Sequence, residues 1–330
     1  MSDDAVISAI NLKKHFKVHK KDPGLSGSIK SLFSRKYETV KAVDDISIRI
    51  DEGELVGFIE PNGAGKTTTL KCLSGLLYPD SGSISVLGFT PWERKKEFLK
   101  QIAFVMGQKN QLWWDLPAVE TFILNKEIYE IPEKSYHKTL SELVSLLEVK
   151  DILKIQVRKL SLGQRMKCEL IAALLHQPKV LFLDEPTIGL DVVMQKKIRD
   201  FVSHYNKSRR ATIILTSHYM DDVKQLAKRV IIIDKGRVIF DGLLEEIIKK
   251  YANHKTITIA FTKPIERSDL KGLGKIKEFN SLKSKIMVKR TAASLAAAEI
   301  LQRLPVEDLN IEEPDIEDII RELFTGKDYA

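Results

Sequence analysis

The chain has 330 residues, of which 43% are hydrophobic, and its formal net charge is +8 at pH 7. A chain of this length can bury the core of an α/β domain of about 240 residues and that of a second, smaller domain, which argues against a disordered protein. Its two cysteines, Cys72 and Cys168, fall on predicted helices, argue against a disulfide framework and favour a reducing compartment. No apolar run approaches the roughly 18–20 residues that span a bilayer, and the N-terminus lacks the features of a signal peptide, so we expect a soluble chain.

A basic segment lies near the N-terminus. Between Lys13 and Lys41, nine Lys or Arg residues stand against two carboxylates. Within it, Ile29, Leu32 and Phe33 would share one face of a short helix. The segment is either a solvated insertion or a contact with anionic lipid headgroups or a protein partner, at about 1 kcal/mol per basic residue near such a surface. Nucleic acid is not favoured, because no aromatic residues interleave with the basic ones.

A phosphate-binding loop follows the first buried strand. The apolar run 55–59 predicts the strand, and residues 69–73 predict the helix that follows the loop. The loop glycines allow backbone N–H groups to converge on an anion, and the helix N-terminus adds unpaired donors and partial positive charge. The lysine would reach the β- and γ-phosphates, and the first threonine hydroxyl would coordinate Mg²⁺. The residues predicted to contact nucleotide are Asn62, Gly63, Ala64, Gly65, Lys66, Thr67 and Thr68.

The loop departs from the pattern G-x-x-x-x-G-K-[ST] at its first position, where this chain has Glu60. Because Pro61 follows, Glu60 is restricted to the β or polyproline region, which would point its carboxylate away from the loop. The simpler expectation is a tolerated substitution with a solvated side chain. The alternative is that its charge weakens nucleotide binding, by about 1 kcal/mol even at the dielectric constant of water.

Two carboxylates end a second buried strand. The apolar run 181–183 is typical of a central parallel strand, and it delivers Asp184 and Glu185 to the edge where α/β folds bind ligands. Asp184 would hold Mg²⁺ through water. Glu185 would polarise the water that attacks the γ-phosphate.

A third motif carries a family resemblance. The run Leu160-Ser161-Leu162-Gly163-Gln164-Arg165 matches the signature L-S-G-G-Q of ABC transporter ATPases, except at Leu162. Over roughly residues 6–250 the chain resembles an ATP-binding subunit of that superfamily. The resemblance implies that Ser161, Gly163 and Gln164 cap and open a helix that points at the γ-phosphate held by the opposite subunit. Hydrolysis would then need two subunits.

The resemblance implies roles for four further residues. Gln108 would contact Mg²⁺ and water and report the nucleotide state to the transport subunit, and His218 would bond the γ-phosphate and the catalytic carboxylate. Asp191, in Gly189-Leu190-Asp191, would cross the dimer interface, although a helix N-cap is the simpler interpretation, and both can hold. Phe16 would stack on adenine or else belong to the core.

Two regions outside these motifs are informative. Trp113 and Trp114 cannot both enter one core from a regular element, so docking of a permease and core packing are equal alternatives. With Leu162, this region resembles a bacterial export-type subfamily similar to drug-resistance exporters. From residue 251 onward, the patterns predict strands at 255–261, 285–289 and 306–311 and a helix at 292–304, with a role in dimer support or regulation.

These observations predict an α/β fold. The resemblance specifies a P-loop NTPase core of the ABC ATPase type, with a RecA-like mixed sheet, an antiparallel β subdomain and a helical subdomain at about 109–175. This core would span residues 1–250, with a basic insertion at about 17–40, and residues 251–330 would form a small C-terminal α+β domain.

The predicted function is an ATP-binding and ATP-hydrolysing subunit with ATP and Mg²⁺ as cofactors, Glu185 and His218 as catalytic residues, and Thr67, Gln108 and Asp184 at the metal. It would pair with a second ATP-binding subunit, as a homodimer, and with integral membrane permease subunits on the cytoplasmic face of the membrane. Nucleic acid is not expected as a partner. The alternatives are a soluble ABC-type ATPase acting on nucleic acid or ribosomes, and a regulatory subunit whose hydrolysis is impaired by Glu60.

Overall fold

The computed structural model describes the chain in two compact units, residues 1–241 and 242–330. The described residues are 5–19, 37–60, 65–107, 109–217, 219–251, 254–314 and 316–325. The helix predicted around residues 29–33 lies outside them. None of the helices in these ranges is long and apolar enough to cross a bilayer.

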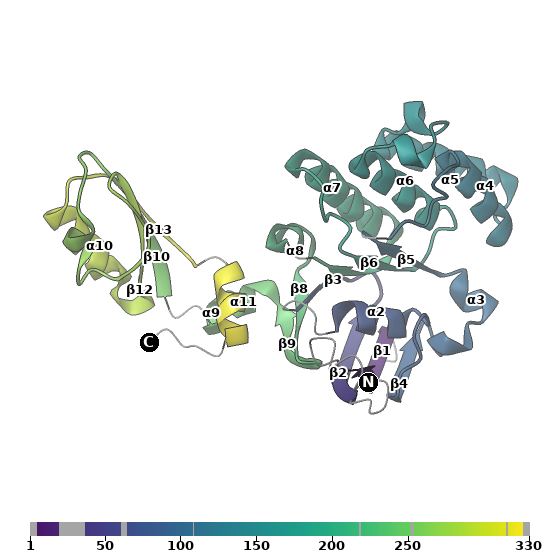
Figure 1. Ribbon diagram of the computed structural model, residues 1–330, viewed down its shortest axis with the longest axis horizontal. Coiled ribbons are helices and arrows are strands. Elements are labelled where there is room, and N and C mark those ends of the chain that lie inside the picture. Colours follow the sequence, from purple (N-terminus) through teal and green to yellow (C-terminus); the bar gives the residue numbers. More distant parts are fainter. Residues whose placement is uncertain are drawn as a thin grey trace, which may run out of the picture. The chain divides into compact units, whose positions relative to one another are not determined.

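The large unit is built on a six-stranded sheet in the order β5-β6-β7-β3-β8-β9 (Figure 1). The pairs from β5 to β8 are parallel, and their strands are apolar runs buried on both faces, as parallel strands in α/β folds are. The strands are β3 (Leu55–Ile59), β5 (Ile102–Met106), β6 (Val180–Asp184), β7 (Thr212–Thr216), β8 (Arg229–Asp234) and β9 (Arg237–Leu243). The strand predicted at 55–59 has the observed bounds.

A three-stranded antiparallel sheet in the order β2-β1-β4 forms a second layer of this unit. Its strands are β1 (Ala5–His19), β2 (Tyr37–Asp51) and β4 (Ser81–Val86). β1 and β2 pair along almost their whole length, from Ala5 opposite Asp51 to His19 opposite Tyr37. Residues 13–19 and 37–41 of the basic segment therefore belong to β1 and β2.

Helices cover both faces of the large sheet. α2 lies on the side of the antiparallel sheet, and α4 to α7 cover the opposite face (Figure 1). The helices are α2 (Lys66–Leu73), α3 (Lys96–Leu99), α4 (Ala118–Ile128), α5 (Glu133–Leu147), α6 (Leu162–Leu174), α7 (Val192–Arg209) and α8 (Met220–Leu226). Three short 3₁₀ turns join them, at Pro91–Glu93, Lys150–Ile152 and Val157–Lys159.

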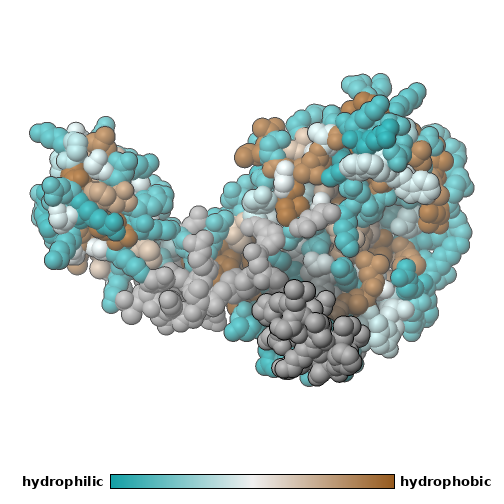
Figure 2. Space-filling model, in the orientation of Figure 1, coloured by the Kyte–Doolittle hydropathy of each residue, from teal (hydrophilic) through white to brown (hydrophobic). Residues whose placement is uncertain are grey.

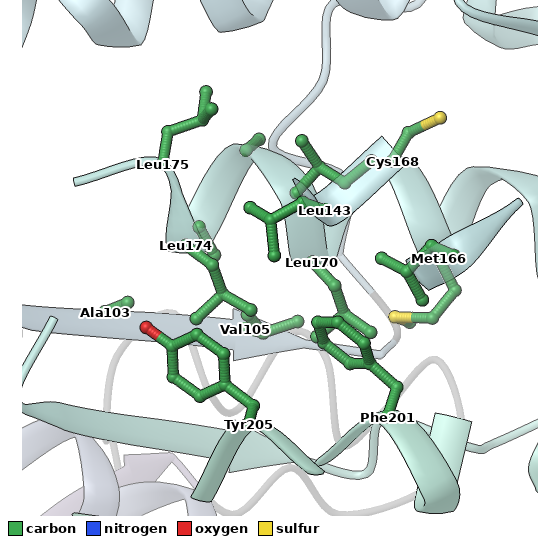
Figure 3. Close-up of a cluster of buried hydrophobic side chains, with 14 of the residues drawn as sticks. Ala103, Val105, Leu143, Met166, Cys168, Leu170, Leu174, Leu175, Phe201 and Tyr205 are labelled. Atoms are coloured by element: carbon green, nitrogen blue, oxygen red, sulfur yellow. The ribbon is translucent and has the colours of Figure 1, made fainter. Parts of the chain in front are cut away.

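Alternating strand residues supply two cores, one on each face of the sheet. On β5, Val105 faces the helical core, where side chains from α6 and α7 converge on the strand, among them Leu170 and Phe201 (Figure 3). On the neighbouring strand β6, Phe182 lies opposite Phe104, the residue before Val105, and it faces the other core with α2 and the antiparallel sheet. Cys168 is buried in the first core and Cys72 in the second, and both are free thiols on helices, as predicted.

The small unit contains a four-stranded antiparallel sheet in the order β11-β12-β10-β13, with α10 against one face. This order is that of a split βαβ plait, in which the first helix is reduced to the 3₁₀ turn Arg267–Leu270. A second turn, Arg290–Ala292, precedes α10. The elements are α9 (Leu244–Tyr251), β10 (His254–Phe261), β11 (Lys275–Asn280), β12 (Lys283–Lys289), α10 (Ala293–Arg303), β13 (Val306–Glu312) and α11 (Ile316–Thr325).

Candidate nucleotide site

The carboxyl ends of neighbouring parallel strands meet at one edge of the large sheet. β3, β7 and β6 are adjacent, and the register places Asp184 of β6 opposite Thr216 of β7. Such an edge is where open α/β sheets bind ligands. The fold brings Lys66, Thr67 and Glu185 to it as well.

The start of α2 presents its backbone donors at this edge. Gly65 has φ of 140°, and a Cβ there would lie 2.1 Å from the carbonyl oxygen of Ala42, so the position requires glycine. Lys66, the first helical residue, is buried, and Thr67 and Thr68 are half-buried in the same turn. Burial lowers the pKa of Lys66, while the charges of Glu185, Glu60 and Asp184 act in the opposite direction. The ammonium group is thus held among carboxylates rather than in solvent.

Thr67 and Asp184 form a pair of oxygen ligands suited to Mg²⁺. The Thr67 hydroxyl donates to Oδ2 of Asp184 at 2.8 Å, and Thr216 donates to Oδ1 at 2.7 Å. Mg²⁺ is usually held by one or two protein oxygens together with substrate phosphates, so this donor set fits the ion. The two residues line a cavity of about 130 Å³ whose lining is Thr67, Lys71, Met106, Lys109, Asp184 and Glu185.

Glu185 occupies a strained turn directly after β6. Its φ is +56°, which is uncommon for a residue with a side chain. Its backbone N–H donates to both the carbonyl and the hydroxyl oxygen of Thr216, each at 3.1 Å. The amide of Gly107, at the end of β5, donates to the carbonyl of Asp184 at 2.8 Å. The backbone of this turn is therefore fixed by the strands on both sides.

Glu60 is not solvated, so the simpler expectation for it is wrong. Its side chain is 6% exposed, and its Oε2 accepts a hydrogen bond from the backbone N–H of Lys66 at 2.7 Å. Burial raises the pKa of Glu60 to about 7, against the effect of the Lys66 amide and ammonium. The carboxylate thus turns towards the helix N-terminus, where the N–H of Lys66 is its partner.

The signature residues form the N-terminus of α6. The Ser161 hydroxyl accepts from the N–H of Gln164 at 3.2 Å, and the Gln164 side chain accepts from the N–H of Ser161 at 2.9 Å, so together they make a capping box. Gly163 is buried, and a Cβ there would lie 2.7 Å from the side chain of Met194 in α7. The geometry agrees with the predicted capping and close approach at this helix end.

Asp191 caps α7. Its carboxylate accepts from the N–H of Met194 at 2.9 Å, as the simpler interpretation of this residue predicted. The next two residues, Val192 and Val193, are 75% and 68% exposed. Apolar side chains this exposed at the start of a helix suit an interface.

Phe16 lies on β1, opposite Val40 of β2, and is 36% exposed. Lys14 Nζ lies 5.7 Å from the centroid of its ring. Ala42, two residues along β2, contacts the start of α2. The ring is therefore not part of a core, and it lies on the strand pair that passes the phosphate-binding helix.

Five predicted site residues lie outside the described part of the chain. They are Asn62, Gly63, Ala64, Gln108 and His218. Their described neighbours Gly107 and Ser217 belong to segments that end at the site edge.

A buried charged network beside the site was not predicted. The Asp222 carboxylate on α8 is fully buried and accepts from Arg199 Nη1 of α7 at 2.8 Å and from the Ser217 hydroxyl at 2.6 Å. Thr187, two residues after Glu185, also donates to it. The network ties the segments after β6 and β7 to α7. Thr216 was missed too, although a polar residue closing a buried strand is a signal that the sequence carries.

The two tryptophans belong to a surface, so the alternative of core packing is wrong. Trp113 and Trp114 are 58% and 48% exposed. The guanidinium of Arg165, on the first turn of α6, lies 5.4 Å from the centroid of the Trp114 ring. Hydrophobic patches lie over the part of the large unit that carries α4 (Figure 2). Other exposed apolar residues of this region are Leu116, Ile123, Leu124 and Ile128.

Comparison with known proteins identifies the family. Residues 43–188 match the ABC transporter family model, and residues 253–312 match the C-terminal domain of EvrA-like ABC transporters. The chain is 34% identical to the ABC transporter ATP-binding protein NatA of Bacillus subtilis over 65% of this chain and 87% of NatA. It is 36% identical to the bacitracin transport ATP-binding protein BcrA of Bacillus licheniformis over 65% of this chain and 67% of BcrA.

A solved structure shares the fold. A dimeric ATP-binding cassette in a post-hydrolysis state, bound to ADP and Pi, aligns with a TM-score of 0.59 at 22% identity, over 72% of this chain and 98% of that one. The predicted fold class, with its ABC ATPase core and small C-terminal domain, is confirmed. On the sequence relationship to NatA and BcrA, the chain belongs to the ATP-binding, ATP-hydrolysing subunits of the ABC transporter family.

Proposed function

We propose that this chain is the motor of an ABC exporter and that two copies hydrolyse two ATP molecules between them. The observation that carries the proposal is the hydrogen bond between Thr67 and Asp184, which brings the loop helix and the carboxylate strand together at 2.8 Å beside Glu185. Thr67 and Asp184 would hold Mg²⁺, Lys66 would bind the β- and γ-phosphates, and Glu185 would orient the attacking water. Bound Mg²⁺ would neutralise charge on the phosphates.

The described part of the site supports a shared dimer site. The capping box at Ser161 leaves the remaining N–H groups of the first turn of α6 available for an anion, and nothing in this first turn is acidic. Exposed Val192 and Val193 supply apolar surface next to Asp191. The solved relative with ADP and Pi is a dimer. We include Gly163 and Gln164 in the part of the site that the partner copy supplies, and Gln108 and His218 in the part that senses the γ-phosphate.

The membrane partners would dock on the surface of Trp113 and Trp114. Exposed tryptophans are favoured anchors of interfaces. Since Arg165 stacks on Trp114 and belongs to the signature helix, movement of a docked permease would reach that helix directly. The chain would then work at the cytoplasmic face of the membrane. The adenine ring of the bound nucleotide would stack on Phe16. The direction of transport rests on the likeness to exporter subunits such as those of antibiotic resistance, and BcrA is named for bacitracin transport.

The experiment is to trap the ATP-bound dimer. Glu185→Gln keeps the volume of the side chain and removes the charge that orients water, so the variant should bind MgATP and stay dimeric. Light scattering after size exclusion should give twice the mass of the nucleotide-free protein. Glu97→Gln, an equal change of charge at an exposed position in α3, is the matched control and should behave as wild type. Wild-type turnover in Glu185→Gln, or a monomer with MgATP, contradicts the proposal.

A further inference from the structure

The carboxylate of Glu60 accepts a hydrogen bond from a backbone N–H group that nucleotide phosphates would otherwise use. Its Oε2 accepts the N–H of Lys66 at 2.7 Å, and both residues are buried. The same lysine returns its ammonium to the main-chain carbonyl of Glu60 at 3.2 Å. Glu60 and Lys66 are thus joined by two hydrogen bonds at the start of α2. The N-cap residue of this helix, Gly65, has no side chain to serve as an acceptor.

The N-terminus of α2 is suited to bind an anion, and the Glu60 carboxylate already lies there. The first-turn N–H groups carry the positive end of the helix dipole and attract a negative oxygen. Glu60 reaches that place from six residues upstream, as a tethered acceptor. A phosphate oxygen that bonded the same N–H would have to lie within about 3 Å of it, which is the position that Oε2 now fills.

The charges around Glu60 would oppose the entry of a phosphate group at this helix N-terminus. The charge of the Lys66 ammonium lowers the pKa of Glu60, but the same ammonium also interacts with the charges of Glu185 and Asp184. Asp234 of β8 adds further negative charge. An entering polyphosphate therefore meets a carboxylate that cannot be screened by water, because its side chain is buried.

We propose that Glu60 is an internal competitor of the nucleotide's phosphate groups, which must displace its carboxylate from the Lys66 amide before they bind. Glu60 is then the residue that sets nucleotide affinity at this site. The inference rests on the nucleotide site proposed above and concerns only the polyphosphate part of the ligand. Adenosine, which has no phosphate, does not compete.

The test is calorimetric titration at pH 8 of wild type, Glu60→Gly and Glu60→Gln with adenosine, MgADP and MgATP. A hydrogen bond to a charged group is worth enough that its loss should tighten MgADP and MgATP about 10- to 100-fold in Glu60→Gly. Glu60→Gln, which keeps an acceptor but loses the charge, should fall between that variant and wild type. Adenosine should bind all three proteins equally.

Glu52→Gln is the matched control. It removes one exposed carboxylate at the opposite end of β3 and should leave every affinity unchanged. Equal or weaker MgATP binding by a folded Glu60→Gly overturns the inference and leaves the proposed function standing. Failure of every protein to bind MgATP at millimolar concentration overturns both. A thermal melt of each variant shows that it is folded, and Glu60→Gln preserves the side-chain volume if the glycine variant is not.

Discussion

The buried ion pair between Asp222 and Arg199 gives a prediction whose magnitude follows from the structure. Asp222 is fully buried and the Arg199 side chain is 7% exposed, and the two meet at 2.8 Å. Asp222→Asn leaves the arginine as an uncompensated buried charge, which costs about 3–5 kcal/mol. A unit of about 240 residues loses about 2–4 °C of melting temperature per kcal/mol, so we expect a decrease of about 6–20 °C.

Tryptophan fluorescence is the assay, because all three tryptophans lie in the large unit and report its unfolding alone. Asp221→Asn is the control: it changes the same charge in the same first turn of α8, but at an exposed position. Its loss should be about 0.3–1 kcal/mol, as for a charge near a helix dipole. A melting temperature for Asp222→Asn within about 2 °C of that control would refute the assignment of a stabilising buried pair. Asp222→Leu combined with Arg199→Met should recover part of the loss, because no charge is left buried.

Two further predictions concern the site. Since burial raises the pKa of Glu60 to about 7, its carboxyl is mostly neutral at pH 6 and mostly charged at pH 8. The ratio of the MgATP affinity of Glu60→Gln to that of wild type should therefore decrease towards one as the pH falls from 8 to 6. Calorimetry in matched buffers that showed a constant ratio would exclude titration of Glu60 in this range. Ser161→Ala removes the cap of α6 and should cost about 0.5–2 kcal/mol of stability by fluorescence-monitored denaturation, whereas Ser161→Thr, which keeps a capping hydroxyl, should cost little.

The sequence predicted β3 and β6 of the large unit, because parallel strands that are covered on both faces appear as continuous apolar runs. β11 was missed for a physical reason. Its residues Ile276 and Phe279 are three apart rather than two, since a bulge lies between Ile276 and Glu278, and the expected alternation is broken. The long pairing of β1 with β2 was also not predicted, because the two strands are separated along the chain by residues 20–36 and no local pattern sets their register.

The site was predicted where a motif is local and missed where partners are distant. Lys66, Thr67, Asp184 and Ser161 were predicted as site residues because each belongs to a short motif, whereas the contact between Thr67 and Asp184, which are 117 residues apart, forms only in the folded chain. The orientation of Glu60 was predicted wrongly, since the restriction imposed by a following proline concerns the backbone and the free N–H at Lys66 decided the side chain. No local pattern joins Asp222 to Arg199, which are 23 residues apart and meet only in the folded chain.

The most direct test of the central claim is MgATP turnover by the purified chain beside Glu185→Gln and Glu97→Gln. The account predicts turnover by wild type and Glu97→Gln that depends on Mg²⁺, and turnover by Glu185→Gln that is lower by at least about 100-fold, since the carboxylate acts as the base or orients the water. Equal turnover by all three proteins would contradict the assignment of Glu185, and of the hydrolytic site built around Thr67 and Asp184.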